Sequence, residues 1–461
     1  MRTPVKPLVA ALAVALAGCA IGPDYERPPV DLPEKLVASP AATAMAERWW
    51  TVFGDPALDA LVDEAIASNR DLAAAAQRIE QSRAQFTVTR SDQLPAVGIQ
   101  GSRSRDRSSE RGSFPPPAES IESNTNRLVL RASWELDFWG KYRRATEAAR
   151  ADLAATEAGR DAIRASLVGE VTRGYFNLRA LDESRAVALR TLEGRRKGLE
   201  LQRNRFDAGV VAELELRQVE SDVAGAEALV PQIERNLAAQ ESALALLAGR
   251  SPRAVFEARV ARGPIVTPAA VEVPAGLPSD LLLRRPDLRQ AEERLKAANA
   301  RIGVARAAYF PSITLTGFYG GESQQLSDLF TGPARTWTLA AGLLQPVYGA
   351  GQIAAGVDLA DARTREAALA YQQAIANAFR ETRNAIVAQG TTREALRAQR
   401  ERERVLTRGL ELSRLRHDGG TVSLFEYLET ERQLLLVRLE AIAAERERRD
   451  AVVDLYLALG G

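Results

Sequence analysis

Few residues in this chain of 461 could carry out chemistry. It contains one cysteine (Cys19), one histidine (His417) and two methionines. This composition excludes zinc sites built from Cys and His, internal disulfides, and catalytic triads that combine His with Cys or use two imidazoles. The sequence has no Walker loop and no Gly-x-Gly-x-x-Gly fingerprint after a strand. We therefore expect neither enzymatic activity nor a bound metal or other cofactor.

The single cysteine lies in a setting that favours acylation. Arg2 and Lys6 precede an apolar run at residues 8–17, which is too short to span a bilayer and is typical of an export signal. The sequence Leu-Ala-Gly-Cys at residues 16–19 resembles the bacterial lipobox, in which the cysteine is acylated and becomes the new N-terminus. We therefore predict a signal peptide at 1–18 and a lipid-anchored, extended, Pro-rich segment at 19–55. An ordinary signal with a coincidental cysteine is the alternative. Ala20, rather than Asp, follows Cys19, which by the same resemblance implies the outer membrane.

The overall charge argues against nucleic acid as a partner. Lys and Arg number 61 and Asp and Glu number 60, and the two signs are interleaved along the chain. A nucleic-acid-binding protein would need a basic patch, which this balance does not provide.

Two halves of the chain share one plan. Residues 69–101 align with 285–317 without gaps at a shift of 216, and residues 205–211 align with 416–422 at a shift of 211. We interpret this as a tandem duplication. It predicts a first repeat at 56–249, a Pro-rich connection at 250–285 and a second repeat at 286–461.

Each repeat is expected to contain a β-hairpin. A helix, at 56–91 or 286–309, should stop shortly before Pro95 or Pro311, because the residue before a proline disfavours helical geometry. Two segments then follow on either side of a polar loop, and their side chains alternate between apolar and polar. This period of two predicts a pair of strands with one apolar and one polar face.

Each repeat should also contain a very long helical hairpin. Residues 142–205 and 352–416 lack proline and are rich in Ala, Arg, Glu and Leu. They predict helices of roughly 65 residues, about 95 Å long at 1.5 Å per residue. A short glycine-containing turn then leads into a returning helix. The fold class is therefore mainly α with two β-hairpins.

The strands could insert into a membrane or cap a soluble coiled-coil rod. Favouring insertion, five aromatic residues are expected to cluster where strands meet helices, like an aromatic membrane belt: Trp134, Phe138, Trp139, Trp337 and Tyr348. Four strands cannot close a barrel, and an open sheet edge is not tolerated in lipid. If the strands insert, the chain must oligomerise, and three copies would supply twelve strands.

With the lipobox, the twofold repeat, the glycine turns and the Gly-Pro-Asp-Tyr-Glu-Arg-Pro stretch at 22–28, the sequence resembles the TolC-like outer-membrane factors. It is most similar to their lipoprotein, NodT-type branch, which serves resistance–nodulation–division pumps, and the resemblance covers nearly the whole chain. It implies a homotrimer with a 12-stranded β-barrel in outer-membrane lipid on a helical barrel in the periplasm. The connection and the chain ends would form an equatorial belt. A periplasmic adaptor protein and a proton-driven inner-membrane pump would be its partners.

The resemblance also assigns roles to the two turns and to three glutamates. The turns would dock the adaptor through Asp207, Gly209, Val211, Asp418, Gly420 and Val422, and we expect positive φ at both glycines because each chain reversal is tight. Carboxylates six and nine residues after Gly420 would ring the periplasmic gate. These are Glu426 and Glu429, which share a helix face, and Glu215 is the first-repeat equivalent. The family often has Asp there, and the basic residue that can pair with such a carboxylate is replaced by Val422. Plain turns and solvated glutamates are the alternatives.

The expected function is the outer-membrane exit duct of a tripartite efflux pump, passively conducting small toxic compounds or drugs out of the periplasm. An outer-membrane channel for protein secretion is the first alternative, and the lipid anchor and the 22–28 stretch favour the pump over it. A periplasmic lipoprotein scaffold without a pore is the second.

Overall fold

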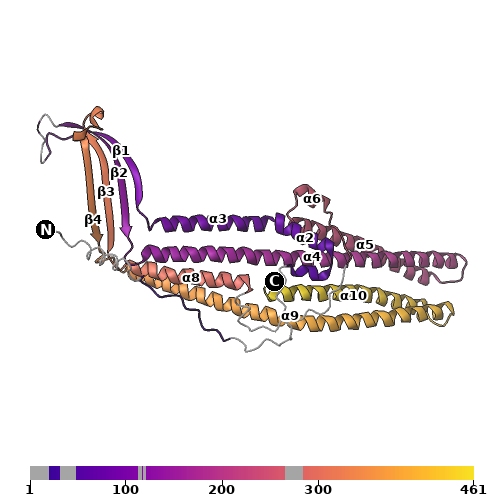
Figure 1. Ribbon diagram of the computed structural model, residues 1–461. Helices are drawn as coiled ribbons and strands as arrows, with labels where there is room; N and C mark the ends of the chain where they lie inside the picture. The colour runs from indigo at the N-terminus through magenta and orange to yellow at the C-terminus, as the bar shows by residue number, and fades with distance from the viewer. Residues whose placement is uncertain (1–19, 32–47, 113–116, 118–120, 265–283) are drawn as a thin grey trace. The chain divides into compact units, whose positions relative to one another are not determined.

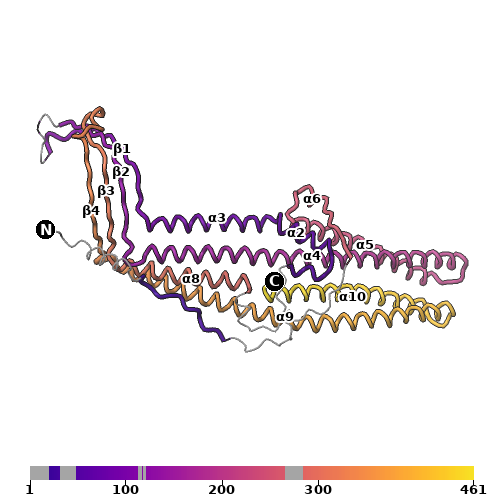
Figure 2. Tube along the Cα trace, viewed as in Figure 1, coloured from indigo at the N-terminus to yellow at the C-terminus, as the bar shows by residue number. Residues whose placement is uncertain are grey.

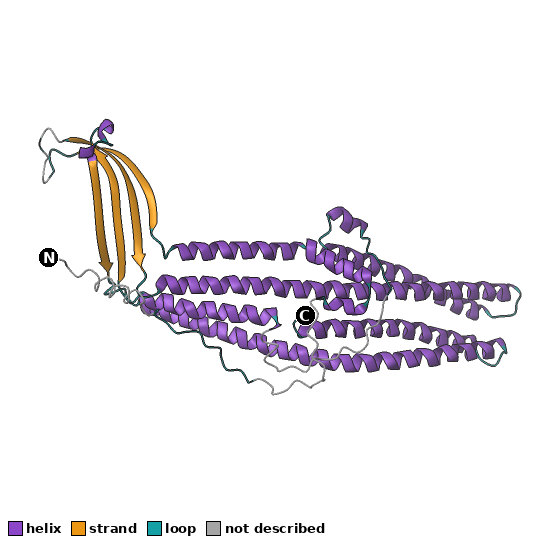
Figure 3. Cartoon of the chain, viewed as in Figure 1, coloured by secondary structure: helices purple, strands orange, loops and turns teal. Residues whose placement is uncertain are grey.

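The computed structural model describes residues 20–31, 48–112, 117, 121–264 and 284–461 (Figure 1). The predicted signal peptide, Cys19 and most of the Pro-rich connection lie outside these residues. The described chain consists mainly of helices, with four strands (Figure 3).

From α3 and α8 onward, the two repeats have the same elements in the same order, as predicted; α2 has no counterpart among the described residues of the second repeat. The helices α3 and α8 each have 22 residues, the strands β1 and β3 have 12, the helices α4 and α9 have 67, and α5 and α10 have 35. The first repeat contains α2 (Pro56–Ser68), α3 (Arg70–Ser91), β1 (Ala96–Arg107), β2 (Glu122–Leu136), α4 (Lys141–Asp207) and α5 (Glu213–Leu247). The second contains α8 (Pro286–Ala307), β3 (Ser312–Ser323), β4 (Arg335–Leu344), α9 (Gln352–Asp418) and α10 (Leu424–Ala458).

The strands form one antiparallel sheet in the order β1-β2-β3-β4. Both predicted hairpins are present, and β2 also pairs with β3, which joins the two repeats. Opposite residues share a face, so one face carries most of the large apolar side chains. Several of these are highly exposed, including Ile99 at 77%, Leu339 at 80% and Trp337 at 69%.

Two short regions differ from the sequence prediction. The helix expected at 56–91 is interrupted at Asn69, whose extended backbone ends α2 and whose side-chain oxygen accepts the amide hydrogens of Asp71 and Leu72. Asn69 thereby caps the N-terminus of α3. The segment expected to be extended up to residue 55 instead contains a 3-10 helix, Trp49–Phe53, because its aromatic side chains are drawn into a core.

The chain divides into two compact units that do not follow the repeats. Of the described residues, one unit comprises those within 20–30, 78–157 and 290–372, and includes the sheet; the other comprises those within 48–77, 158–264, 284–289 and 373–461. The second unit holds a large apolar cluster built from the 3-10 helix, α2, α4, α5 and α10. There Trp49 stacks on Tyr456 with ring centroids 5.1 Å apart. The buried Asp55 caps α2 and accepts the hydroxyl of Tyr175 at 2.7 Å.

A carboxylate in the second unit makes stability depend on pH. Burial raises the pKa of Asp450 on α10 to about 6, although Arg446 lies 3.6 Å away and opposes the shift. The folded chain therefore keeps this proton up to about pH 6, whereas the unfolded chain releases it near pH 4. Stability due to this group is thus lost as pH rises from about 4 to 6.

We expect Asp450→Asn to stabilise the protein at pH 7 by up to roughly 3 kcal/mol, and to have little effect near pH 4. Thermal unfolding of both proteins at the two pH values measures this. Glu440→Gln is the matched control, because Glu440 lies on the same helix, is more exposed and pairs with Arg402 at 2.7 Å. Equal melting temperatures of wild type and Asp450→Asn at pH 7 would contradict the expectation.

Candidate functional site

The two turns between the long helices adopt the predicted conformation. Gly209 has φ of 74° and Gly420 has φ of 70°, which confirms the expectation of positive φ. At each turn the residue after the glycine donates its N–H to a carbonyl five residues earlier, Val210 to Arg205 and Thr421 to Arg416, both at 2.9 Å. This is the Schellman pattern of a glycine-terminated helix. Both turns lie at the same end of the second unit (Figure 2).

The surface around these turns carries exposed apolar side chains. Val210 is 71% exposed, Leu214 69% and Phe425 64%. The predicted docking residues Asp207 and Asp418 are exposed as well. An exposed apolar patch on a monomer is typical of a contact surface.

The predicted gate glutamates lie on the first turns of α10 but differ in their partners. Ser423 caps the helix by accepting the N–H of Glu426, and the Glu426 carboxylate has no partner among the described residues. Glu429 instead contacts Arg432 one turn later and accepts a hydrogen bond from Gln433 at 3.0 Å. Glu215 occupies the corresponding first turn of α5, again without a partner in the described part of the chain. Sequence reasoning missed Arg432, although its spacing of three from Glu429 was visible.

The helices that carry these glutamates pack against each other near the turns. A cluster joins Leu216 and Val219 of α5 to Leu424 of α10, with Tyr427 against it. Beside it, the buried Arg195 of α4 lies 3.8 Å from Glu431 of α10 and donates to the carbonyl of Asp222. Burial raises the pKa of Glu431, and Arg195 opposes that shift. The pair links the two repeats close to the gate residues, and sequence spacing gave no signal for it.

The aromatic residues lie at two levels of the sheet rather than one. Trp134 and Trp139 stand where strands meet helices; their indole N–H groups donate to the carbonyls of Gln93 and Pro311. Phe138 and Tyr348 follow β2 and β4 at this same end. Trp337 instead pairs with Tyr319, near the loop end, so the prediction of a single cluster is wrong for Trp337. It lies four residues from Ala341, the residue level with Trp134, or about 14 Å along the strand.

The motif at residues 22–28 is bound to the helices of the first unit. Glu292 of α8 is 7% exposed and accepts hydrogen bonds from Tyr25 at 3.2 Å and from the Arg27 guanidinium at 2.8–3.0 Å. Asp24 pairs with Arg144 of α4 at 2.8 Å. Burial, followed by Glu292, raises the pKa of Tyr25. The motif therefore anchors the segment that follows Cys19.

We expect Glu292→Gln to loosen this anchor, because the guanidinium of Arg27 loses its charged partner. A loss of about 1.4 kcal/mol would speed chymotryptic cleavage after Tyr25 about tenfold. Glu293→Gln is the matched control, since Glu293 pairs with Lys296 instead. Equal cleavage rates in the two variants would show that the contact with Glu292 does not hold the segment.

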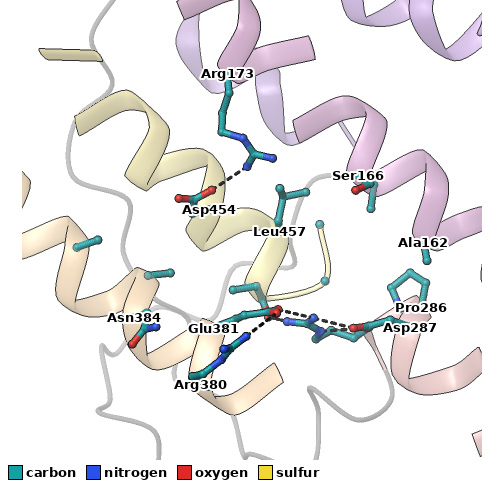
Figure 4. Close-up of a pocket in the computed structure, with 17 residues that line it drawn as sticks. Ala162, Ser166, Arg173, Pro286, Asp287, Arg380, Glu381, Asn384, Asp454 and Leu457 are labelled. Carbon is teal, nitrogen blue, oxygen red and sulfur yellow. Dashed lines mark hydrogen bonds and ion pairs between the residues drawn. The ribbon is translucent and has the colours of Figure 1, made fainter. Parts of the chain in front are cut away.

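A cavity of about 630 Å³, lined by charged and apolar residues, lies in the second unit, between α4, α9 and the C-terminus (Figure 4). Arg285, which is 8% exposed, donates to Asp287 and Glu381, each at 2.7 Å, and to the carbonyl of Ala458. Across the cavity Arg173 pairs with Asp454. The charges are balanced and paired with each other, so this site ties helices together.

Within the part of the chain that the structure describes, no helix is both long and apolar enough to cross a membrane. No group of three or more His, Cys, Asp or Glu side chains in the same ranges is placed to hold a metal ion.

The long helical hairpins joined to a four-stranded sheet define the fold of outer-membrane channels. The crystal structure of the Campylobacter jejuni CmeC outer membrane channel superimposes with a TM-score of 0.91 at 28% identity, covering 96% of this chain and 95% of that one. The cation efflux system protein CusC of Escherichia coli O6:H1 is 32% identical over 465 residues, 100% of this chain and 99% of that protein. The probable efflux pump outer membrane protein TtgC of Pseudomonas putida is 33% identical, over 98% of this chain and 94% of that protein.

A family model described as outer membrane efflux protein matches residues 61–250 and 277–461. The chain belongs to the outer membrane efflux protein family, and its fold class, family and outer-membrane location are as the sequence predicted.

Proposed function

We propose that this chain, as a homotrimer, forms the exit duct through which a tripartite efflux system passes small toxic compounds from the periplasm to the outside. The main support for this proposal is the four-stranded sheet. Its edge strands β1 and β4 have no partner strand among the described residues, and one face exposes large apolar side chains. In lipid, those edges must be paired, and three sheets joined edge to edge close a twelve-stranded barrel.

The proposed protein partners bind at the end of the duct that carries the two glycine turns. The apolar patches at the Gly209 and Gly420 turns are the proposed docking sites for a periplasmic adaptor protein, which connects the duct to a proton-driven inner-membrane pump. The duct performs no reaction; it supplies a polar passage, and the pump supplies the energy and most of the selectivity. The name of CusC, a cation efflux system protein, supports a cargo of small solutes.

Expression in a strain that lacks its own outer-membrane factor but keeps the adaptor and pump tests this function. We expect the chain to restore resistance to pump substrates, and purified protein to run as a trimer by native mass spectrometry. A monomer that restores no resistance with any cognate pump and adaptor would contradict the proposal.

The lipid anchor makes a separate prediction. Cys19→Ser should abolish acylation and lower the yield in the outer membrane, while trimers still form. A single acyl chain anchors weakly, whereas a twelve-stranded barrel contributes far more to membrane attachment. Metabolic labelling with a radioactive fatty acid measures the change, and unaltered labelling of the variant would rule out Cys19 as the acylated residue.

A further inference from the structure

Four arginines lie on the apolar face of the sheet, at its loop end. The strand register and the alternation of side chains place three residues of β1 on the same face as Ile99, and one residue of β4 on the same face as Trp337. They are Arg103, Arg105, Arg107 and Arg335. We call them the arginine band.

The arginine band begins where the apolar surface stops. On β4, Leu343, Ala341, Leu339 and Trp337 follow one another on this face, and Arg335 is the next side chain on it. Trp337 pairs with Tyr319, so two aromatic side chains border the band. From Leu343 to Arg335 is eight residues, about 27 Å along the strand. Tyr and Trp mark the border between hydrocarbon and headgroups in membrane barrels, so the arginine band stands at headgroup level.

The arginine band carries more positive than negative charge. All four side chains are exposed. Arg105 and Arg107 share Glu122, with Glu110 beside Arg107. Arg103 and Arg335 have no ion pair among the residues that the structure describes. Within the described ranges, four guanidinium groups therefore face two carboxylates.

The opposite face of the sheet uses its arginines internally. Arg127 lies 3.5 Å from Glu322 and 4.3 Å from the centre of the Phe318 ring. Arg131 donates to the side chain of Gln100 at 2.8 Å. Both arginines of this face thus have a side-chain partner within the sheet, whereas no ion pair or side-chain hydrogen bond is found for Arg103 and Arg335 among the described residues.

We propose that the arginine band binds the phosphate groups of lipopolysaccharide, the phosphorylated glycolipid of the outer leaflet. A guanidinium group suits phosphate because it can donate two parallel, charge-assisted hydrogen bonds. The proposal rests on the insertion of the sheet proposed above. In a ring closed from β4 to β1, Arg335 would stand at the same seam as Arg103 of the partner subunit, so each seam of the barrel would present a basic site.

The test measures binding of lipopolysaccharide and of its dephosphorylated form to the purified full-length trimer in detergent. Arg103→Gln with Arg335→Gln should weaken binding of the phosphorylated form about twenty-fivefold, since each basic residue at an anionic lipid surface contributes a factor of about five. Arg127→Gln with Arg131→Gln is the matched control, because it removes the same charge from the opposite face. Its binding should stay close to that of wild type. Arg103→Lys with Arg335→Lys should retain part of the affinity.

Three results would overturn the proposal: equal affinity of wild type for the dephosphorylated glycolipid, an equal loss in the control, or equal affinity for phosphatidylglycerol vesicles. If the Gln variant does not assemble, Arg335→Gln alone replaces it and should lose about fivefold. Conductance of the same preparations separates this proposal from the proposed function. Channels that conduct but bind phosphorylated and dephosphorylated lipopolysaccharide equally would refute only the proposed binding by the arginine band. Protein that forms no conducting channel would refute the proposed function as a duct.

Discussion

Gly420→Val is expected to abolish export while the trimer stays intact. Gly420 has φ of 70°, where a residue with a Cβ costs about 1–2 kcal/mol and a β-branched one more. A Cβ at this position would meet no atom within 4 Å, so the strain falls on the turn itself rather than on the helix packing. The turn should therefore rearrange locally and misplace the proposed docking surface. Gly209→Val, at φ of 74°, should act in the same way.

Drug resistance of a complemented strain measures this effect, together with the heat resistance of the trimer on gels. Both turn variants should be as sensitive as the empty strain. Gly409→Val is the control, because Gly409 lies inside α9 and also has open space around it. Normal resistance in both turn variants would count against docking at the turns.

Glu426→Gln with Glu429→Gln is expected to weaken the cation preference of the channel and to raise its conductance. In a trimer these residues would bring six carboxylates around one axis. Two like charges about 6 Å apart cost roughly 3 kcal/mol at an effective dielectric constant near 20, so such a ring attracts cations.

Glu426 and Glu429 should contribute unequally to the cation preference, because, of the two, only Glu429 is paired with an arginine in the described structure. Arg432 already contacts Glu429, whereas the Glu426 carboxylate has no partner among the described residues. Glu426→Gln alone should therefore reduce cation preference more than Glu429→Gln alone. Arg432→Gln should increase it, because it frees Glu429. Reversal potentials in a salt gradient across a planar bilayer give these preferences, and identical values in all variants would place the constriction elsewhere.

Most of the fold could be predicted because it repeats. The shift of 211 that aligns the turns also relates α4 to α9 and α5 to α10, and Gly249 and Gly460 end their helices with matching positive φ. The break at Asn69 was harder to foresee. An Asn can continue a helix or cap one, and here its bond to the carbonyl of Leu247, 178 residues away, favours the cap.

The site was predicted less completely than the fold. The glycine turns follow from local backbone geometry, so the prediction of positive φ at Gly209 and Gly420 was correct. The level of Trp337 depends on strand register, which alternation alone does not set. Arg195 and Glu431 approach each other only because α4 packs against α10, and a single sequence contains no signal for that contact.

Single-channel recording of the purified full-length protein in a planar bilayer shows directly whether the trimer is an open duct. A trimeric exit duct predicts discrete, uniform conductance steps from material that runs as a trimer, with cation preference that falls in Glu426→Gln. Trimers that insert into the bilayer and never conduct, with the gate glutamates intact or replaced, would show that the protein is not an exit duct.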